Sequence, residues 1–108
     1  MSTSAVFEWD ERKNTANIAK HGIDFRLAVQ VFEGPVVTWV DDRRDYGETR
    51  AVSIGIVKGS AILTLVHTDR AGRRRIISAR PASERERYRY DQAIRASAQP
   101  GGDRGGSG

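Results

Sequence analysis

The spacing of apolar side chains divides the chain into an N-terminal helical part and a longer part with the alternation typical of β-strands. In the N-terminal part, one short apolar run predicts a strand and two capped segments predict helices; they cover residues 6–9, 11–21 and 25–32. Asp10 and Asp24 are favourable N-cap residues, and Gly22 is a favourable residue directly after a helix. We expect Gly34-Pro35 to end the second helix.

Between residues 36 and 80, β-branched and aromatic side chains alternate with polar ones, and turn-forming residues separate the runs. These runs predict four strands, over residues 36–40, 49–57, 61–68 and 73–80. In the second strand, the alternation places Val52, Ile54 and Ile56 on one face. Pro81 stops the last strand and is allowed in the first turn of a closing helix. A mostly charged segment over residues 82–96 predicts this helix, and its thin apolar side indicates a loosely held element.

The predicted fold class is α+β: a twisted antiparallel sheet is flanked by two N-terminal helices and one C-terminal helix. In this arrangement two helices cover one face of the sheet, and the other face is left open. With 108 residues the chain is long enough for one domain, which we place at residues 1–96. Residues 97–108 are rich in glycine and poor in apolar side chains, so we expect a disordered tail there.

Composition excludes several kinds of site. The chain has no cysteine, which excludes disulfide bonds, zinc–thiolate sites and thiol nucleophiles. No apolar run approaches the ~20 residues that a membrane-spanning helix needs, and the N-terminus has no signal-peptide pattern. We therefore expect a cytoplasmic protein that does not associate with a membrane.

Positive charge is concentrated in the middle of the chain. The net charge of +4 is divided unevenly, with −3 over residues 1–42, +6 over residues 43–80 and +1 over residues 81–108. Fifteen of the 18 basic residues are arginines, which bind phosphate through two parallel hydrogen bonds. One interpretation is a solvated, arginine-rich surface; the other is a phosphate-binding face in the middle segment.

Three arginines of this segment are our first candidates for contacts with a scissile phosphate: Arg50, Arg75 and Arg80. Arg75 and Arg80 are five positions apart, so a regular strand points them to opposite faces. Both can serve one site only if the strand ends or bulges between them. Otherwise one of them forms a structural ion pair, for which Glu48 and Glu84 are candidate partners.

Three further residues are candidates for acid–base or stacking roles. His67 titrates near neutral pH and is either a general acid or base or a structural, hydrogen-bonded histidine. Glu48 is a candidate base if Arg50 keeps it ionised, and a simple salt bridge is the alternative. Tyr88, on the closing helix, either contacts RNA or packs on the sheet edge.

The remaining basic candidates bind substrate rather than catalyse. Arg70 lies in a predicted turn and is either a clamp for the RNA backbone or a solvated residue. Arg73 and Arg74 are candidate electrostatic attractors. Lys20 and His21 end the first helix, where they either reach the substrate or complement the helix dipole.

Aromatic and acidic residues of the first half have structural interpretations. Trp9, Phe25, Phe32 and Trp39 are interpreted as core side chains, because they lie in the acidic part of the chain, away from the basic strands. The acidic residues of the 41–45 loop are interpreted as loop caps rather than metal ligands. We therefore predict no metal and no other cofactor.

Several short motifs, in this order and spacing, resemble the BrnT toxins; they are Phe7-Glu8-Trp9-Asp10, Asn17, Lys20-His21-Gly22-Ile23, Phe25, Ala28, Val31-Phe32, Tyr46-Gly47-Glu48-Thr49-Arg50, Gly55, Thr68-Asp69-Arg70, Arg75-Ile76-Ile77-Ser78-Ala79-Arg80 and Glu84 to Tyr88. The resemblance covers about residues 6–90. It implies a RelE-like fold and a type II toxin that cleaves RNA. It also implies neutralisation by a BrnA-type antitoxin with a ribbon-helix-helix region, through which alone the complex contacts operator DNA. His67 departs from the family pattern, where a tyrosine is expected, so no role is transferred to it.

Three hypotheses follow for the function. The first is a metal-independent ribonuclease, in which the 2′-hydroxyl of RNA attacks the phosphodiester and arginines stabilise the developing charge. The second is a basic module that binds nucleic acid or an antitoxin without chemistry. The third is a protein–protein interaction subunit. Only the first predicts new RNA ends that persist in EDTA, and only the third predicts unchanged RNA affinity after charge reversal at Arg75 or Arg80.

Overall fold

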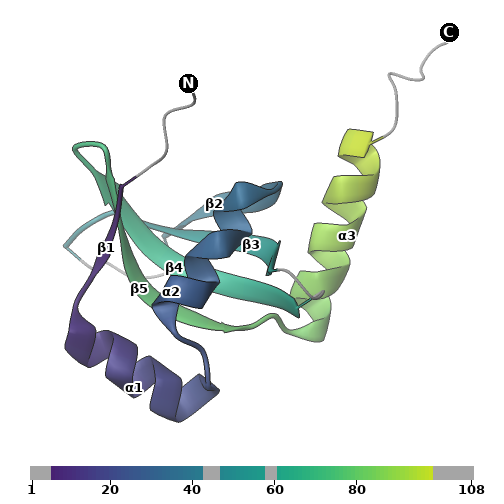
Figure 1. The fold of residues 1–108 in the computed structure, drawn as a ribbon. Coiled ribbons are helices and arrows are strands. Elements are labelled where there is room, and N and C mark those ends of the chain that lie inside the picture. The colour runs from purple at the N-terminus through teal and green to yellow at the C-terminus, as the bar shows by residue number, and fades with distance from the viewer. Residues whose placement is uncertain (1–5, 43–46, 58–60, 99–108) are drawn as a thin grey trace, which may run out of the picture.

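The computed structural model describes residues 6–42, 47–57 and 61–98, which form five strands, three α-helices and one 3-10 helix. In chain order these are β1 (Val6–Trp9), α1 (Glu11–His21), α2 (Phe25–Ala28), the 3-10 helix η1 (Val29–Glu33), β2 (Val36–Asp41), β3 (Arg50–Val57), β4 (Ala61–Arg70), β5 (Arg73–Pro81) and α3 (Glu84–Ala98) (Figure 1). The order of elements confirms the order predicted from the sequence. The predicted helix caps are also present, because the side chains of Asp10 and Asp24 accept from Arg12 N and Arg26 N, and Gly22 has a φ of 72°.

The sheet is mixed, not antiparallel throughout as predicted. Its strand order is β1-β5-β4-β3-β2, in which β2 to β5 form an antiparallel meander and β1 pairs with β5 in parallel. The chain leaves β1 at one edge of the sheet, passes through α1, α2 and η1, and enters β2 at the opposite edge. The last strand therefore returns beside the first. A run of four residues carries no pattern that indicates which strand it pairs with, or in which direction.

The second predicted helix changes type halfway. Its α-helical part ends at Ala28, and the remaining residues form the 3-10 helix η1. Val29 and Val31 are β-branched and lower the α-helix propensity of this segment, and 3-10 geometry is common at helix C-termini. A second constraint is close packing: a Cβ atom at Gly55 of β3 would lie 2.7 Å from Val31 Cβ. The apolar spacing found the buried face of this segment but not its helix type.

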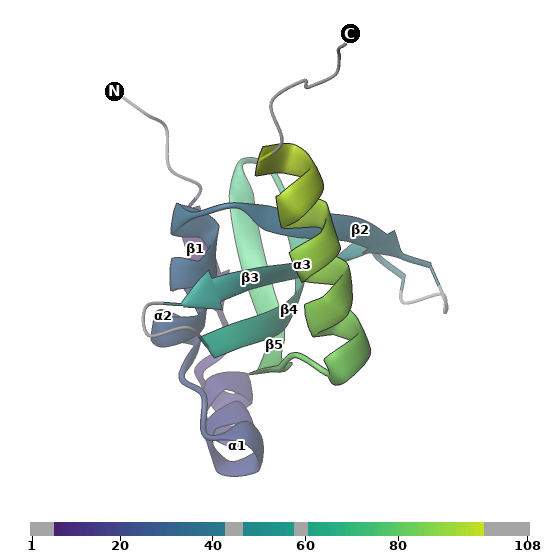
Figure 2. The same cartoon turned by 90° about the vertical axis from the view of Figure 1, so that its right-hand side faces the viewer.

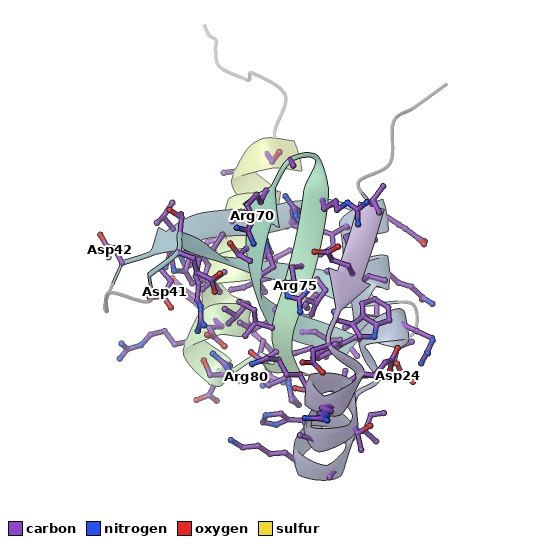
Figure 3. The ribbon with its side chains drawn as sticks, turned by 90° about the vertical axis from the view of Figure 1, so that its left-hand side faces the viewer. Asp24, Asp41, Asp42, Arg70, Arg75 and Arg80 are labelled. Atoms are coloured by element: carbon purple, nitrogen blue, oxygen red, sulfur yellow. The ribbon has the colours of Figure 1, made fainter. Side chains whose placement is uncertain are left out.

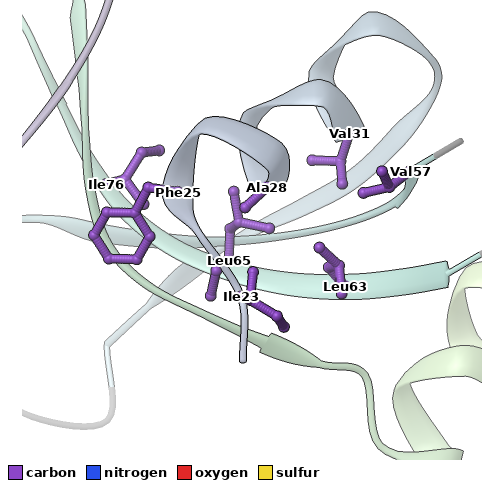
Figure 4. Packing of buried hydrophobic residues seen from close by; sticks show 9 residues of the cluster. Ile23, Phe25, Ala28, Val31, Val57, Leu63, Leu65 and Ile76 are labelled. Carbon is purple, nitrogen blue, oxygen red and sulfur yellow. The ribbon is translucent and has the colours of Figure 1, made fainter. Parts of the chain in front are cut away.

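The hydrophobic core lies between this helical segment and one face of the sheet. Its buried members come from α2, η1, the loop before them and three strands; they are Ile23, Phe25, Ala28, Val31, Val57, Leu63, Leu65, Ile76 and Ala79 (Figure 4). The half-buried rings of Trp9 and Phe32 pack against this cluster, as predicted, and so does the ring of Phe7. We call this side of the sheet the core face.

The opposite face of the sheet is not left open, because α3 contacts β2 and β3 (Figure 2). This helix begins at Glu84, two residues later than predicted, since Ser83 and Glu86 form a reciprocal capping box: Glu86 N donates to Ser83 Oγ and Ser83 N donates to a Glu86 carboxylate oxygen. The helix ends at Ala98, so Ser97 belongs to it rather than to the predicted tail. Residues 99–108 lie outside the described residues. Tyr90 is the anchor of α3: it is buried, and its hydroxyl donates to Pro35 O at 3.0 Å.

Candidate nucleic-acid interface

Arg75 and Arg80 lie on the same face of the sheet because β5 bulges between them. Along the β4–β5 ladder, Arg80 pairs with Thr64 and Arg75 pairs with Thr68, and the register shifts between Val66 and His67. Residues 64 and 68 are four positions apart on one strand, so their partners share a face. The extra residue on β5 is Ile77, which has no partner in the ladder. The condition that the sequence set for a common site, a bulge between the two arginines, is met.

Three further arginines share this face. Arg73 alternates with Arg75 on β5, Arg70 pairs with Arg73 across the β4–β5 turn, and Arg50 alternates with Val52 on β3. We call this side of the sheet the arginine face; its arginines are Arg50, Arg70, Arg73, Arg75 and Arg80. Figure 3 shows Arg70, Arg75 and Arg80 following one another along the β4–β5 ribbon. The face opposite the core therefore carries all three first candidates for phosphate contact.

Glu8 of β1 holds two of these arginines in place. Its carboxylate oxygens lie 3.1 Å from Arg73 Nη1 and 3.5 Å from Arg75 Nη1. The hydrogen bond from Arg73, followed by the charge of both arginines, lowers the pKa of Glu8. The side chain of Arg75 stays 41% exposed and that of Arg73 62% exposed. Both guanidinium groups are therefore held by one partner and remain accessible to a phosphate.

Arg80 forms a two-point ion pair with Glu86 of α3. Nη1 lies 2.7 Å from Oε1 and Nη2 lies 2.8 Å from Oε2. Thr64 Oγ1 and Ser83 N also donate to this carboxylate. These hydrogen bonds, with Arg80 first, lower the pKa of Glu86 to about 2, so it is an anion at any neutral pH. The structural partner of Arg80 is thus Glu86, rather than the expected Glu48 or Glu84.

Glu48 lies instead beside Arg50, a position that fits both the simple salt bridge and the aligned base that the sequence left open. Its Oε2 accepts from Arg50 Nε at 3.2 Å, and both side chains are partly exposed. Across the sheet, Arg50 pairs in register with the buried Asp41 of β2. A base candidate and a cation therefore stand together on the arginine face.

A cavity of about 210 Å³ opens on the arginine face beside Arg80. Its lining comes from β2, β3, β4, β5 and α3; the residues are Trp39, Val40, Asp41, Asp42, Val52, Val66, Arg80 and Glu86.

Trp39 was predicted as core, and that prediction was wrong. In β2 it alternates with Thr38, whose hydroxyl lies 2.8 Å from Ser53 Oγ on the core face, so the indole lies on the other side. The guanidinium of Arg89 lies 4.2 Å from the centre of the Trp39 ring. The neighbours of Trp39 along the chain are acidic and indicate a core residue, but the sheet places β2 beside the basic strands.

His67 lies on the core face and is fully buried. Its Nδ1 lies 2.9 Å from Asp69 Oδ1, and its Nε2 lies 2.8 Å from Ser53 Oγ. Burial lowers the pKa of His67, so the ring is neutral near pH 7. A carboxylate only accepts hydrogen bonds, so Nδ1 carries the proton and Nε2 accepts from the serine hydroxyl. This Ser–His–Asp order is that of a hydrolase triad, but both Ser53 and His67 are fully buried. The geometry supports the structural interpretation of His67, not the catalytic one.

Two other candidates point away from the arginine face. Arg74 lies on the core face, where it donates twice to the carboxylate of Asp69 and stacks 4.6 Å from the centre of the Phe32 ring. Tyr88 is 67% exposed on α3. It is two positions from both Glu86 and Tyr90, which face the sheet, so it projects from the opposite side of the helix. Neither residue belongs to the site that the other candidates form.

Lys20 and His21 lie in the last turn of α1, a helix that contacts β5. His21 lines a second, mostly apolar cavity of about 480 Å³ with Ile23, Leu27 and neighbouring residues. This position matches the dipole interpretation, since both residues occupy the last turn of α1.

In residues 6–42, 47–57 and 61–98, no three histidine, aspartate or glutamate side chains form a group that could hold a metal ion. Asp45, part of the acidic loop considered above, lies outside these ranges. No helix in the same ranges is long and apolar enough to cross a membrane.

Comparisons with known proteins identify a family and a similar fold. The family described as the ribonuclease toxin BrnT of type II toxin–antitoxin systems matches residues 9–86. The fold is similar to the crystal structure of the Brucella abortus ribonuclease toxin BrnT, with a TM-score of 0.56 and 27% sequence identity, over 75% of this chain and 100% of that chain. A comparison with curated protein sequences found no match. Because the family match spans well over half of the sequence, this chain belongs to the BrnT family of ribonuclease toxins.

Proposed function

We propose that this toxin is an endoribonuclease that cuts RNA without a metal ion, on the arginine face of its sheet. The 2′-hydroxyl oxygen of one nucleotide attacks the adjacent phosphorus and the bond to the 5′-oxygen breaks, leaving a 2′,3′-cyclic phosphate and a 5′-hydroxyl. The observation that supports the proposal most is the bulge at Ile77, which brings Arg75 and Arg80 to one face with Arg50. RNA supplies the nucleophile, so the protein needs only to position it and to stabilise charge.

The three arginines have the chemistry that this step needs. A guanidinium group keeps its charge at any physiological pH and donates two parallel hydrogen bonds to a phosphate. Negative charge grows on the phosphate oxygens as the 2′-oxygen attacks, and fixed donors bind that state more tightly than the starting ester. Arg75 has the exposure to make such contacts. Glu48, held by Arg50, is our candidate for the base that accepts the 2′-hydroxyl proton. The departing 5′-oxygen takes its proton from water, and the hydroxide that this leaves takes the proton back from Glu48.

Arg70 and Arg73 extend this surface beyond the proposed reaction centre. They lie at the β4–β5 turn, and the side chain of Arg73 is well exposed. We propose that they attract the RNA backbone and hold it along the ribbon. We assign binding rather than catalysis to both residues.

Neutralisation by a partner follows from the same surface. We propose that the partner is a BrnA-type antitoxin with a ribbon-helix-helix region, which blocks the arginine face and alone contacts operator DNA. A type II toxin has a protein antitoxin, and an acidic segment is complementary to a face with five arginines. A RelE-like relationship of the fold, a cytoplasmic location and inhibition of translation through RNA cleavage complete the proposal.

The test is cleavage of a labelled RNA beside a DNA of the same sequence, each with EDTA and with Mg²⁺. We expect RNA to be cut in both buffers with 2′,3′-cyclic phosphate ends, and DNA to stay intact because it lacks the 2′-hydroxyl. RNA that is bound but never cut would replace the enzyme by a binding module. Cleavage that EDTA abolishes and Mg²⁺ restores would leave a ribonuclease but overturn the metal-free chemistry.

A further inference from the structure

Helix α3 makes two contacts with the arginine face that together have the chemistry of a nucleotide. Glu86 places an anionic group on the paired Nη atoms of Arg80, at 2.7 and 2.8 Å. Three residues further along the helix, Arg89 places a flat, delocalised group 4.2 Å from the ring centre of Trp39. Arg80, Glu86 and Trp39 all line the cavity beside Arg80, so both contacts involve its lining.

Each contact has a direct counterpart in RNA binding. Arginine accepts a phosphate through the same two-point geometry that it uses for a carboxylate. An indole ring stacks with a nucleobase as readily as with a guanidinium plane. A phosphate and its own base are also joined by a short linker, as Glu86 and Arg89 are joined by one turn of helix.

The attachment of α3 to the sheet is small. Among the side chains described for α3, only Tyr90 is buried. The helix contacts β2 and β3, and its other links to the sheet include the hydrogen bond from Thr64 to Glu86. Together with Tyr90, Glu86 and Arg89 hold α3 in this position, and the side chain of Arg80 is still 40% exposed.

We propose that Arg80 and Trp39 form a nucleotide subsite for single-stranded RNA, with the phosphate on Arg80 and the base on Trp39, and that α3 occupies this subsite through Glu86 and Arg89. RNA and α3 then compete for the same two side chains. This inference rests on the proposed function for its choice of ligand. Stacking on an indole is tolerant of sequence, so the subsite selects unpaired RNA rather than a particular base.

The competition is tested by removing the charge of Glu86 while keeping its shape. Glu86→Gln retains a side chain that completes the capping box, but it weakens the two-point pair with Arg80. Asp91→Asn is the matched control, since it removes one negative charge from an exposed i, i+4 ion pair with Arg95 on the same helix. The probe is an oligouridylate whose 2′-oxygens are methylated, so that it cannot be cut.

We expect Glu86→Gln to bind this probe about fivefold more tightly than the unaltered chain, the gain of losing one charge-assisted competitor. Asp91→Asn should bind it with nearly unchanged affinity. Equal gains for both variants would show a general charge effect and overturn the proposal. Thermal melts of both variants identify any loss of folding.

Stacking on Trp39 is read from its fluorescence. The chain has two tryptophans, so Trp9→Phe leaves Trp39 as the only indole. We expect saturating probe to quench this signal, and Trp39→Ala to lower the affinity about fivefold or more, with partial recovery in Trp39→Phe. Fluorescence that does not change on binding would overturn the subsite.

If quenching and the Glu86→Gln gain occur but ordinary RNA is not cut, the proposed function fails and the subsite stands. If RNA is cut without quenching, the reverse holds.

Discussion

Asn17 of α1 pairs with the backbone of Ala79 on β5 in the way that a neighbouring strand would. Its Nδ2 donates to Ala79 O at 2.8 Å, and its Oδ1 accepts from Ala79 N at 3.1 Å. The β1–β5 ladder ends at Ile76, so this part of β5 lies beyond the last strand partner. Nδ2 also donates to Ile23 O at 2.9 Å, which ties the loop after α1 to the sheet.

Asn17→Ala should therefore lower the free energy of unfolding by about 2–4 kcal/mol, because it leaves several buried backbone groups without partners. Urea unfolding followed by circular dichroism measures the change. Thr15→Ala, at an exposed position on the same helix, is the control and should change stability by less than about 0.5 kcal/mol. Similar values for both variants would show that Asn17 contributes only as a helical residue.

Buried His67, which is hydrogen-bonded to the partly exposed Asp69, makes stability depend on pH in a window where the carboxylates do not titrate. Burial lowers the folded-state pKa of His67 below its ordinary value of 6.5. As pH falls through 6.5, His67 binds a proton in the unfolded chain but stays neutral in the folded chain. The free energy of unfolding therefore decreases. The slope approaches about 1.4 kcal/mol per pH unit for one proton and ends at the folded-state pKa.

Unfolding curves between pH 7 and pH 5 test this. We expect His67→Gln to flatten the dependence in that window, whatever its effect on stability at pH 7. His21→Gln is the control, since His21 lies at the end of α1 outside the core, and should retain the slope. A slope that survives in His67→Gln would mean that another group titrates. The acidic groups with lowered pKa values, such as Glu8 and Glu86, act only at lower pH.

Two adjacent arginines on β5 separate catalysis from stability. Arg75 lies on the arginine face beside Glu8, whereas Arg74 lies on the core face against Phe32 and Asp69. We expect Arg75→Ala to lower kcat/KM for RNA cleavage by about 10²-fold or more, with little change in melting temperature. Arg74→Ala should cost about 1–2 kcal/mol of stability through its lost stacking and ion pair, and should cut RNA at the normal rate below its melting temperature. The opposite pattern would place the reaction on the core face.

The sequence predicted what depends on neighbours along the chain. The cap at Asp10, the stop at Gly22 and the strands of the meander are local, and each follows from propensity or alternation. The capping box at Ser83 and Glu86 is equally local; the sequence carries its pattern, and the helix start was nevertheless placed too early at residue 82.

What the sequence did not predict depends on the sheet as a whole. Trp39 was assigned to the core from acidic neighbours in sequence, while the strand order places it at the cavity beside Arg80. His67 lies within the basic segment of the sequence, but the alternation along β4 places its side chain on the buried core face. For Arg75 and Arg80 the alternation rule stated the condition correctly, and only the ladder could show that β5 meets it through a bulge at Ile77.

The salt dependence of RNA binding tests which cations touch the phosphate backbone. Arg70 stands at the β4–β5 turn on the arginine face, and Lys20 stands in the last turn of α1, outside that face. Both are exposed, and either alanine variant removes one positive charge, so a long-range effect of net charge would weaken binding similarly. Removing a direct phosphate contact also removes its share of counterion release, which lowers the magnitude of the slope of log K against log salt by about 0.7 per contact for single strands. We expect Arg70→Ala to show that decrease and Lys20→Ala to retain the original slope, measured by fluorescence anisotropy from 50 to 300 mM salt. A decrease in slope for Lys20→Ala instead would move the RNA to the α1 side of the molecule.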